Sequence, residues 1–288
     1  MKKDFKNYKV NIFGFTFGLL PMLITLGCIL VVAIVFWIAS QYTSTFNGYG
    51  LMVGLGFFFA LILACQLCKE RGLPADYPYS LIWWIFPLSI IGARIYYAIF
   101  EGMTDLGQIL RIWDGGLAIY GGIIGGLIGL IICSLLHKHS ILKTTDVIVP
   151  VLALGQAFGR IGCIFGNCCY GVEVTNKALQ WFPISIFVHG EYHYATNFYE
   201  AIFDFILFIV LTILLRKVSI KGINTFAYLV GYGLVRFILE TFRDNAQTLF
   251  IGDMPVSQLV SVGCVLIGAI GICTLLFVNK RKEENIDN

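Results

Sequence analysis

Residues 155–171, GQAFGRIGCIFGNCCYG, place an arginine inside a segment that is otherwise apolar and rich in glycine. At the centre of a bilayer, the charge of Arg160 would cost about 2.5–3.5 kcal/mol on insertion scales. A chain keeps such a residue where it meets a negative partner or lines a wet cavity. This stretch therefore predicts a membrane-spanning helix built around a polar site.

The composition of the whole chain supports a membrane protein. Of its 288 residues, 58% are hydrophobic and 13% are charged, whereas soluble domains carry about 25% charged residues. We therefore expect an all-α integral membrane protein that folds as one polytopic helical bundle. The net charge of +3 follows the expected membrane topology, so we expect no nucleic-acid partner.

Eight apolar segments are each close to the ~20 residues that a helix needs to cross a bilayer. They cover residues 13–38, 48–67, 81–100, 117–136, 147–165, 198–215, 226–240 and 256–277. The first is too long for a signal-peptide core and has no clean cleavage site after it, so we expect it to be retained. The chain then divides into a basic N-terminus with an extra first helix (1–40), a helical bundle (41–279) and a charged tail (280–288).

The basic residues predict the orientation of this bundle. Most of the 20 lysines and arginines fall on one side of the membrane if the N-terminus is cytoplasmic, as the positive-inside rule requires. With eight spans, the C-terminus and its charged tail are then cytoplasmic as well.

Polar side chains are expected to converge near the outer leaflet in this topology. They are Arg94, Arg160, Arg236 and Glu240 near the ends of outward-running spans, and Tyr49, Tyr120, Glu200 and Asp204 near the starts of inward-running ones. Glu240 lies on the same helical face as Arg236 because the two are four residues apart. One alternative is that these groups form structural ion pairs, such as Arg236 with Glu240 or Arg94 with Glu200.

Three intramembrane arginines against few acids suit an anion. The planar guanidinium matches phosphate oxygens with paired hydrogen bonds, and the abundant anion at this depth is a phospholipid headgroup. We therefore expect Arg160, Arg94 and Arg236 to bind a lipid phosphate. Glycines at 121, 122, 125, 126, 155 and 159 would allow close helix packing around that site.

The motifs of residues 48–277 resemble those of the bacterial prolipoprotein diacylglyceryl transferase family. The resemblance rests on GYGLMVGLGF from Gly48, GARIYYAIF from Gly92, IWDGGLAIYGGIIGG from Ile112, GRIG from Gly159, YG from Tyr170 and GYGLVRFILETFRD from Gly231. The family is usually a bundle of seven spans in the bacterial cell membrane, so the first span here is an addition.

The resemblance implies the first step of lipoprotein biosynthesis. Family members transfer the diacylglyceryl group of phosphatidylglycerol to the lipobox cysteine of a prolipoprotein, forming a thioether and releasing glycerol phosphate. It implies that Arg160 corresponds to the family's lipid-phosphate arginine, and that Tyr49, Arg236 and Glu240 correspond to its catalytic tyrosine, arginine and glutamate. The partners implied are phosphatidylglycerol, other membrane lipids and prolipoproteins, and no cofactor is implied.

Three positions depart from the family pattern. Tyr120 replaces the histidine proposed as the base; because a tyrosine with a pKa of about 10 is a poor base, we take Tyr120 as a hydrogen-bonding catalytic residue and assign no base. Cys163 and Cys168 replace an asparagine and an acidic residue. A diverged paralogue with another acceptor, a lipid-binding protein or a transporter therefore remain alternatives, although we find no internal repeat of the kind common in transporters.

Nine cysteines need separate consideration. Most are expected to be small apolar core residues, but Cys163, Cys168 and Cys169 lie beside the expected site. They could form a disulfide, or bind a metal together with His189 or His193. We assign no metal ligand on the sequence alone.

Overall fold

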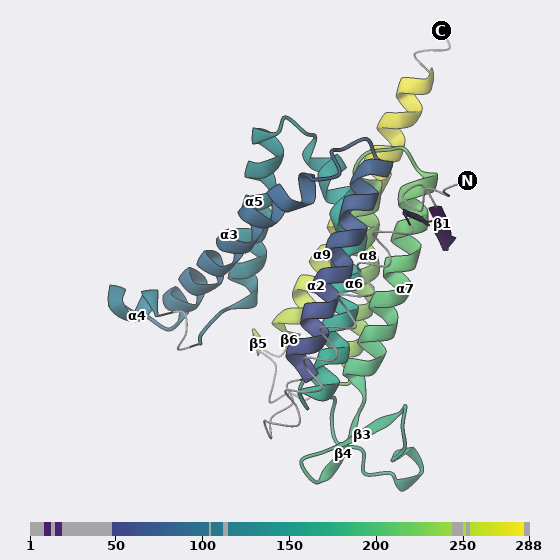
Figure 1. Ribbon diagram of the computed structural model, residues 1–288. Coiled ribbons are helices and arrows are strands. Elements are labelled where there is room, and N and C mark those ends of the chain that lie inside the picture. Colours follow the sequence, from purple (N-terminus) through teal and green to yellow (C-terminus); the bar gives the residue numbers. More distant parts are fainter. Residues whose placement is uncertain are drawn as a thin grey trace, which may run out of the picture.

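The computed structural model describes residues 9–12, 15–18, 48–103, 105–111, 115–243, 250–251 and 254–284. Its main helices are α2 (Gly48–Glu70), α3 (Tyr77–Phe100), α5 (Ile119–Leu136), α6 (Ile141–Phe165), α7 (Thr196–Lys217), α8 (Ile223–Glu240) and α9 (Val256–Glu284). Short elements connect them: α4 (Leu106–Leu110), the 3-10 helix η3 (Lys177–Leu179), the hairpin of β3 (Ser185–Val188) and β4 (Glu191–Tyr194), and the pair of β5 (Phe250–Ile251) and β6 (Met254–Pro255). The helices run side by side as a bundle (Figure 1).

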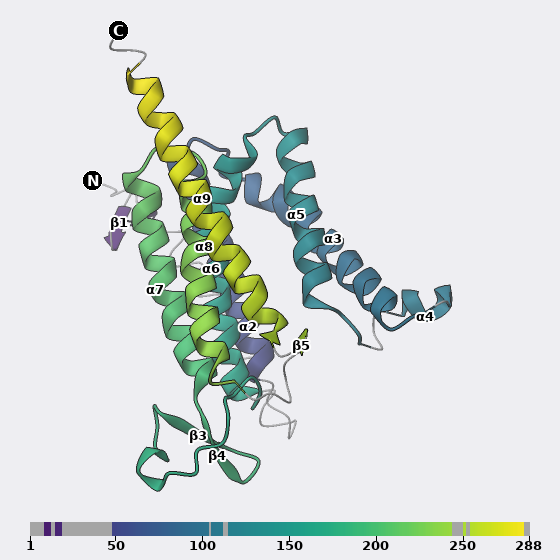
Figure 2. The same cartoon turned by 180° about the vertical axis from the view of Figure 1, so that it is seen from behind.

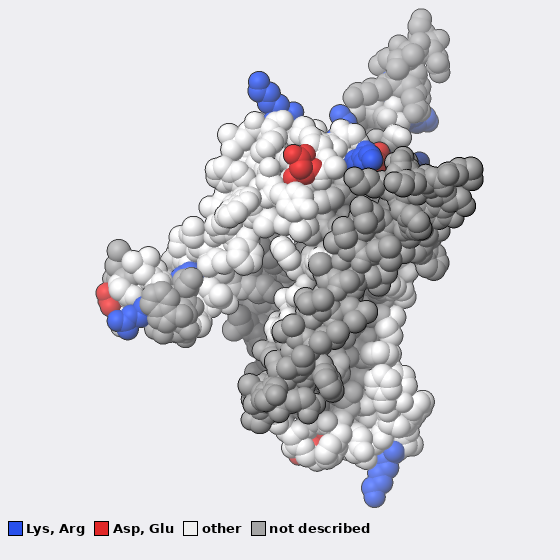
Figure 3. Space-filling view, in the orientation of Figure 1, with Lys and Arg blue, Asp and Glu red and all other residues white. Residues whose placement is uncertain are grey.

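Six of the described helices are long and apolar enough to cross a membrane: α2, α3, α5, α6, α7 and α9. Each coincides with an expected span, so the prediction of a polytopic helical membrane protein is confirmed. Large apolar side chains such as Trp83 and Ile119 are 79% and 72% exposed, as expected for surfaces that face lipid. In Figure 3, the charged residues that the structure describes gather toward the ends of the molecule, with uncharged surface between them.

Helix α8 matches the expected short span at residues 226–240 but is not among these six. It has 18 residues and carries Arg236 and Glu240 in its last two turns. It nevertheless packs lengthwise between α7 and α9 (Figure 2). Its polar residues are therefore enclosed by neighbouring helices.

The start of the expected first span is wrong. Phe15–Gly18 is strand β2, which pairs antiparallel with strand β1 at Lys9–Ile12. Aromatic and β-branched residues dominate these two strands, a composition that favours extended structure. The rest of the expected span, residues 13–14 and 19–38, lies outside the described residues.

Helices α3 and α5 form a tightly packed pair, the α3–α5 arm, that leans away from the other helices in both views (Figures 1 and 2). A β-carbon added at Gly121, Gly125 or Gly129 would approach a backbone oxygen of α3 to 2.3, 2.0 or 2.6 Å. Close packing is thus confirmed at Gly121, Gly125 and Gly126, whereas a β-carbon at Gly122 would meet its nearest atoms at an ordinary 3.7 Å. Gly155 and Gly159 have no atom within 4 Å of such a β-carbon, so the expectation of close packing there is wrong.

The two ends of the bundle are held by polar contacts. At one end, Asp146 of α6 accepts hydrogen bonds from the backbone N–H groups of Gly222 (2.6 Å) and Thr225 (2.8 Å), which caps the first turn of α8. At the other end, called the hairpin end, the segment between α6 and α7 contains the β3–β4 hairpin (Figure 1). This segment falls between the expected spans at residues 147–165 and 198–215, where the sequence predicted no further element. His189 and Gly190 turn the hairpin with φ values of 52° and 95°, which suits a two-residue loop.

Candidate active site

Glu200 bridges two arginines at the hairpin end of the bundle. Its Oε1 lies 2.7 Å from Nη2 of Arg160 and 3.2 Å from Nη1 of Arg236, and its side chain is only 4% exposed. The three residues come from α7, α6 and α8. One buried carboxylate therefore fixes two guanidinium groups on neighbouring helices.

The ion-pair cluster continues along α8. Nη2 of Arg236 lies 2.9 Å from Oε2 of Glu240, and Nη1 of Arg243 lies 3.9 Å from the same oxygen. The pairing of Arg236 with Glu240 at i,i+4 spacing is as predicted. The alternative pairing of Arg94 with Glu200 is wrong, because Glu200 contacts the other two arginines.

The expected shortage of acids near the arginines is also wrong. Asp204, one helical turn after Glu200, is 1% exposed and lies within electrostatic range of Arg160 and Arg236. Neither of its oxygens has a hydrogen-bond partner among the described residues. Three arginines (Arg160, Arg236 and Arg243) are thus interleaved with three carboxyl groups (Glu200, Asp204 and Glu240).

Arg160 nevertheless keeps donors for a further acceptor. Its side chain is 20% exposed, and Glu200 is its only hydrogen-bonding or ion-pair partner within the described part of the chain. Since a guanidinium carries five N–H groups, most of them are available to a group that enters the site.

Arg94 has a different environment. It is 6% exposed and donates to the backbone carbonyls of five residues between α3 and α5: Gln108, Ile109, Arg111, Gly115 and Gly116. All five N–H groups of the guanidinium are matched by these contacts. Arg94 therefore holds the connection that leads into Tyr120.

The two expected tyrosines approach the cluster from different helices. Tyr49, at the start of α2, packs beside Gly162 of α6, where a β-carbon would lie 3.2 Å from its Cδ2. Tyr120, at the start of α5, lies within electrostatic range of Arg236 and Glu240. The structure thus brings Tyr49, Tyr120, Arg160, Arg236 and Glu240 to one end of the bundle, and sets Arg94 apart in its loop.

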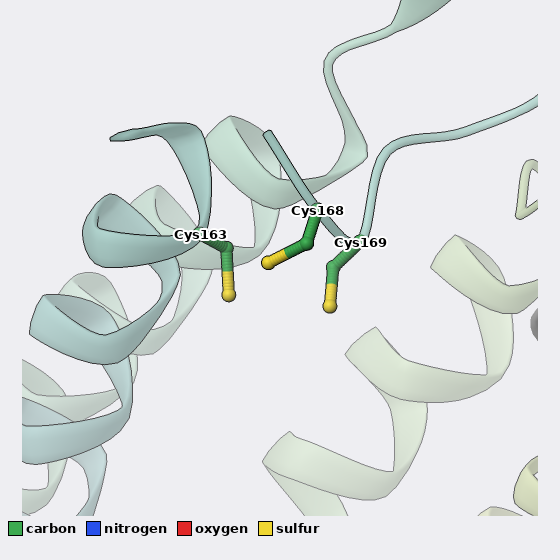
Figure 4. A group of neighbouring side chains, drawn as sticks. All are labelled: Cys163, Cys168 and Cys169. Carbon is green, nitrogen blue, oxygen red and sulfur yellow. The ribbon is translucent and has the colours of Figure 1, made fainter. Parts of the chain in front are cut away.

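A tight turn after α6 gathers three cysteines. The sulfur atoms of Cys163, Cys168 and Cys169 all lie within 4.8 Å of one another, and their side chains project to the same side of the turn (Figure 4). The thiol of Cys163 hydrogen-bonds to Cys169 and lowers its pKa well below the usual range, and the charges of Arg243 and Arg160 act in the same direction. All three are free thiols, so the alternative of a disulfide is not realised.

The histidines considered as metal ligands lie elsewhere. Among the described residues, the only group of three or more potential metal ligands consists of the three cysteines. Nδ1 of His193 is 3.1 Å from the carbonyl oxygen of Gly171, and its ring packs on Tyr170. A metal site that includes His189 or His193 is therefore wrong.

Sequence reasoning missed two residues of this site. Arg243, three residues beyond the expected span at 226–240, has a side chain that is 13% exposed and faces Glu240. Its spacing of three residues from Glu240 was the available signal. Tyr232 lies within electrostatic range of Glu200, Arg236 and Arg160, and it is one turn before Arg236 on α8.

Two apolar cavities lie between the helices of the bundle. One, of about 470 Å³, lies between α2, α3 and α6, and its lining includes Gln156, one turn before Arg160. The other, of about 660 Å³, lies between α3, α5, α6 and α8 and reaches Ile119, the neighbour of Tyr120. Ile85 and Ser89 of the α3–α5 arm border both cavities. The two cavities therefore lie next to each other along the arm.

Comparisons with known proteins agree with this architecture. Residues 34–274 match the family model described as prolipoprotein diacylglyceryl transferase. A phosphatidylglycerol–prolipoprotein diacylglyceryl transferase of Clostridium botulinum (strain Langeland) is 38% identical over 240 residues, which cover 81% of this chain and 94% of the relative. Two proteins of Clostridium perfringens (strain 13), named phosphatidylglycerol–prolipoprotein diacylglyceryl transferase 1 and 2, are 34% and 36% identical and are covered to 93% each, over 83% and 82% of this chain.

Proposed function

This chain belongs to the prolipoprotein diacylglyceryl transferase family, and on that premise we propose how its own residues carry out the reaction. It is a multi-pass membrane transferase. Its substrates are phosphatidylglycerol and a prolipoprotein, and the acceptor is the lipobox cysteine thiol. The observation that carries the proposal is the Glu200 bridge, which holds Arg160 and Arg236 side by side on neighbouring helices.

In the proposed mechanism, the arginines bind the lipid phosphate. The acceptor sulfur attacks the glyceryl carbon, the carbon–oxygen bond to phosphate breaks, and glycerol phosphate leaves with an additional negative charge. Fixed guanidinium groups aimed at that charge stabilise the transition state more than the ground state. Arg160 is suited to this role because most of its donors are available, whereas Arg236 is held between Glu200 and Glu240.

The two cavities fit the two acyl chains of the lipid. Their walls are mainly aliphatic and aromatic, and they include Gln156, one turn before Arg160, and Ile119, the neighbour of Tyr120. A diacylglyceryl lipid could enter with one chain on each side of the α3–α5 arm and its phosphate at Arg160.

The remaining residues complete the site. Tyr120 and Tyr49 are proposed to hydrogen-bond the headgroup or the reacting groups. Arg94 was expected to bind phosphate directly; its five carbonyl contacts favour the role of a positioning residue that sets the entry to α5. Removal of the thiol proton still requires an acceptor, which none of these residues clearly provides.

The charged residues support the proposed orientation. Lys69, Arg216 and Lys217 lie in the last turns of their helices, at the end opposite the hairpin. By the positive-inside rule that end is cytoplasmic. The active site would then lie near the outer leaflet, and both termini would be cytoplasmic.

The test is release of glycerol phosphate from headgroup-labelled phosphatidylglycerol by the purified protein, with a lipobox peptide or its Cys→Ser analogue. We expect release only with the cysteine peptide, together with a thioether-linked lipid on it. No release, while the protein still binds the lipid, would refute the transferase proposal in favour of lipid binding alone.

A substitution at Arg160 tests its proposed contact with phosphate. Arg160→Lys keeps the charge but loses the planar pair of donors, so we expect most of the activity to be lost. Full activity of Arg160→Lys would show that Arg160 serves only as a structural ion-pair partner of Glu200.

A further inference from the structure

The turn that brings Cys163, Cys168 and Cys169 together has an unusual backbone conformation. Asn167 and Cys169 have φ values of 47° and 59°, in the left-handed region, which asparagine adopts more often than other non-glycine residues and cysteine seldom adopts. These conformations reverse the chain so that Cys168 and Cys169 return over Cys163, as Figure 4 shows. Backbone strain of this kind is common at ligand-binding positions.

The surrounding structure holds this turn in place. The side chains of Thr196 and Asn197, at the start of α7, donate to the carbonyl oxygens of Cys169 (3.0 Å) and Cys168 (3.2 Å). The backbone N–H of Cys168 donates to the carbonyl of Cys163 at 3.1 Å. The three sulfur atoms are therefore positioned by the fold and not by contacts with one another alone.

We propose that Cys163, Cys168 and Cys169 bind a zinc ion through three thiolates, and that its open fourth position binds the cysteine thiol of the acceptor protein. The second half of this proposal rests on the proposed function. Zinc with three protein ligands and one open position is the usual arrangement of catalytic zinc sites, whereas structural sites are closed by four. Thiolates also select zinc over harder cations such as magnesium or calcium.

The geometry fits such a site. Zinc–sulfur bonds of about 2.3 Å in a tetrahedron place the sulfurs about 3.8 Å apart. The three sulfurs already lie within 4.8 Å of one another, so small side-chain rotations would close the site. No fourth described residue of metal-binding type belongs to the group, which leaves the fourth position to an incoming ligand.

The charges fit as well. Three thiolates and Zn²⁺ carry a net charge of −1, and both Arg243 and Arg160 lie within electrostatic range of Cys169. Arg243 can offset the charge of the zinc site while Arg160 also faces the phosphate. The thiol and the phosphate would then meet on adjacent sides of Arg160.

A zinc-bound acceptor thiol supplies the chemistry that the ion-pair cluster lacks. On binding zinc, the acceptor thiol becomes a thiolate and its proton passes to water. The zinc-bound sulfur forms the bond to the glyceryl carbon, and the electrons of the broken carbon–oxygen bond leave with glycerol phosphate. Nothing is oxidised or reduced, and the thioether product, a weaker ligand than a thiolate, departs from the zinc.

The first test is metal content. The full-length protein is purified in detergent with a phosphine reductant, incubated with zinc, freed of loosely bound metal and analysed by mass spectrometry. We expect about one zinc per chain, and at least a tenfold weaker affinity in Cys168→Ser and Cys169→Ser. Cys273→Ser, which changes an exposed cysteine of α9, is the matched control and should keep its zinc. Thermal unfolding of each variant separates loss of the site from loss of the fold.

The second test concerns the open position. Cobalt is bound in place of zinc, and its thiolate absorption is recorded with the lipobox peptide and with the Cys→Ser analogue. Only the cysteine peptide should change the spectrum. Absence of bound metal in the wild-type protein, equal metal in the Cys168→Ser and Cys169→Ser variants, a disulfide among the three cysteines, or identical spectra with both peptides would each overturn the proposal.

The two proposals fail in different ways. If the metal-free protein releases glycerol phosphate at the full rate, the transferase function stands and the zinc proposal is refuted. If the metal binds and responds to the cysteine peptide but no glycerol phosphate is released, the proposed transferase function is refuted and the zinc site stands.

Discussion

Glu200→Gln removes the charge that joins Arg160 to Arg236, and it should damage both stability and turnover. The carboxylate accepts from Arg160 at 2.7 Å and from Arg236 at 3.2 and 3.4 Å, and its side chain is 4% exposed. Removing one partner of a buried ion pair costs about 3–5 kcal/mol. The glutamine retains one acceptor oxygen, so we expect destabilisation near the lower end, about 3 kcal/mol.

The effect on the rate follows from the position of the guanidinium groups. Without the carboxylate, two like charges repel each other and both side chains are free to move. A displacement of about 1 Å in a positioning contact can lower the rate about 10²-fold. We therefore expect kcat for glycerol phosphate release to fall by about two orders of magnitude, while the protein still folds and inserts.

A matched control separates this effect from the substitution itself. Glu70→Gln breaks the ion pair with Arg216 at the opposite end of the bundle, where the glutamate side chain is 31% exposed and the two groups are 3.1 Å apart. Partly exposed pairs contribute about 0–1 kcal/mol, so Tm and kcat should change little. If Glu200→Gln unfolds at the same temperature as Glu70→Gln and retains half of the wild-type kcat, the bridge does not organise the site.

Three further substitutions test other parts of the structure. Gly125→Ala should separate the α3–α5 arm, because its β-carbon would approach the Leu88 carbonyl oxygen to 2.0 Å; a Tm lowered relative to Gly155→Ala, where nothing lies within 4 Å, would show this. Arg94→Lys should lower kcat and leave lipid binding unchanged, because three ammonium donors replace five guanidinium N–H groups. Weaker lipid binding with unchanged kcat would instead show that Arg94 binds the phosphate. Tyr120→Phe should lower the rate and Tyr120→His should retain or raise it, if the family motif that Tyr120 resembles carries a histidine at this position; an inactive Tyr120→His protein would contradict that resemblance.

Spacing along one helix made part of the site predictable from sequence. Arg236 and Glu240 are four residues apart, and helix geometry alone places them on one face. The depth of Arg160 and Glu200 followed from counting spans. The sequence therefore predicted that Arg160 and Glu200 lie at the same depth, but not that they form an ion pair at 2.7 Å. That contact depends on the rotation of each helix about its axis, which is set by packing.

Other features depend on groups that a sequence pattern does not reveal. The sequence indicated that Arg94 binds phosphate because it shows no partner for this arginine. Its partners are backbone carbonyl groups, which every residue carries and which therefore leave no signal in a sequence. Gly155 and Gly159 show the small-residue spacing of a tight helix contact, but their surroundings are open. The approach of Cys168 to Cys163 depends on a left-handed conformation at Asn167. An asparagine is common in polar connections, so its presence did not predict this conformation.

The first two turns of α7 connect the two halves of the proposed site. Thr196 and Asn197 hold the carbonyl groups of Cys169 and Cys168, and Glu200, one turn later, holds the arginines. A shift of α7 would therefore move the thiol cluster and the phosphate-binding groups together. Attack by sulfur on a carbon beside a bound phosphate requires that these two groups keep a constant separation. One rigid helix carries the residues that hold the thiol cluster and the residue that holds the arginines. This arrangement maintains the separation better than two independently moving loops would.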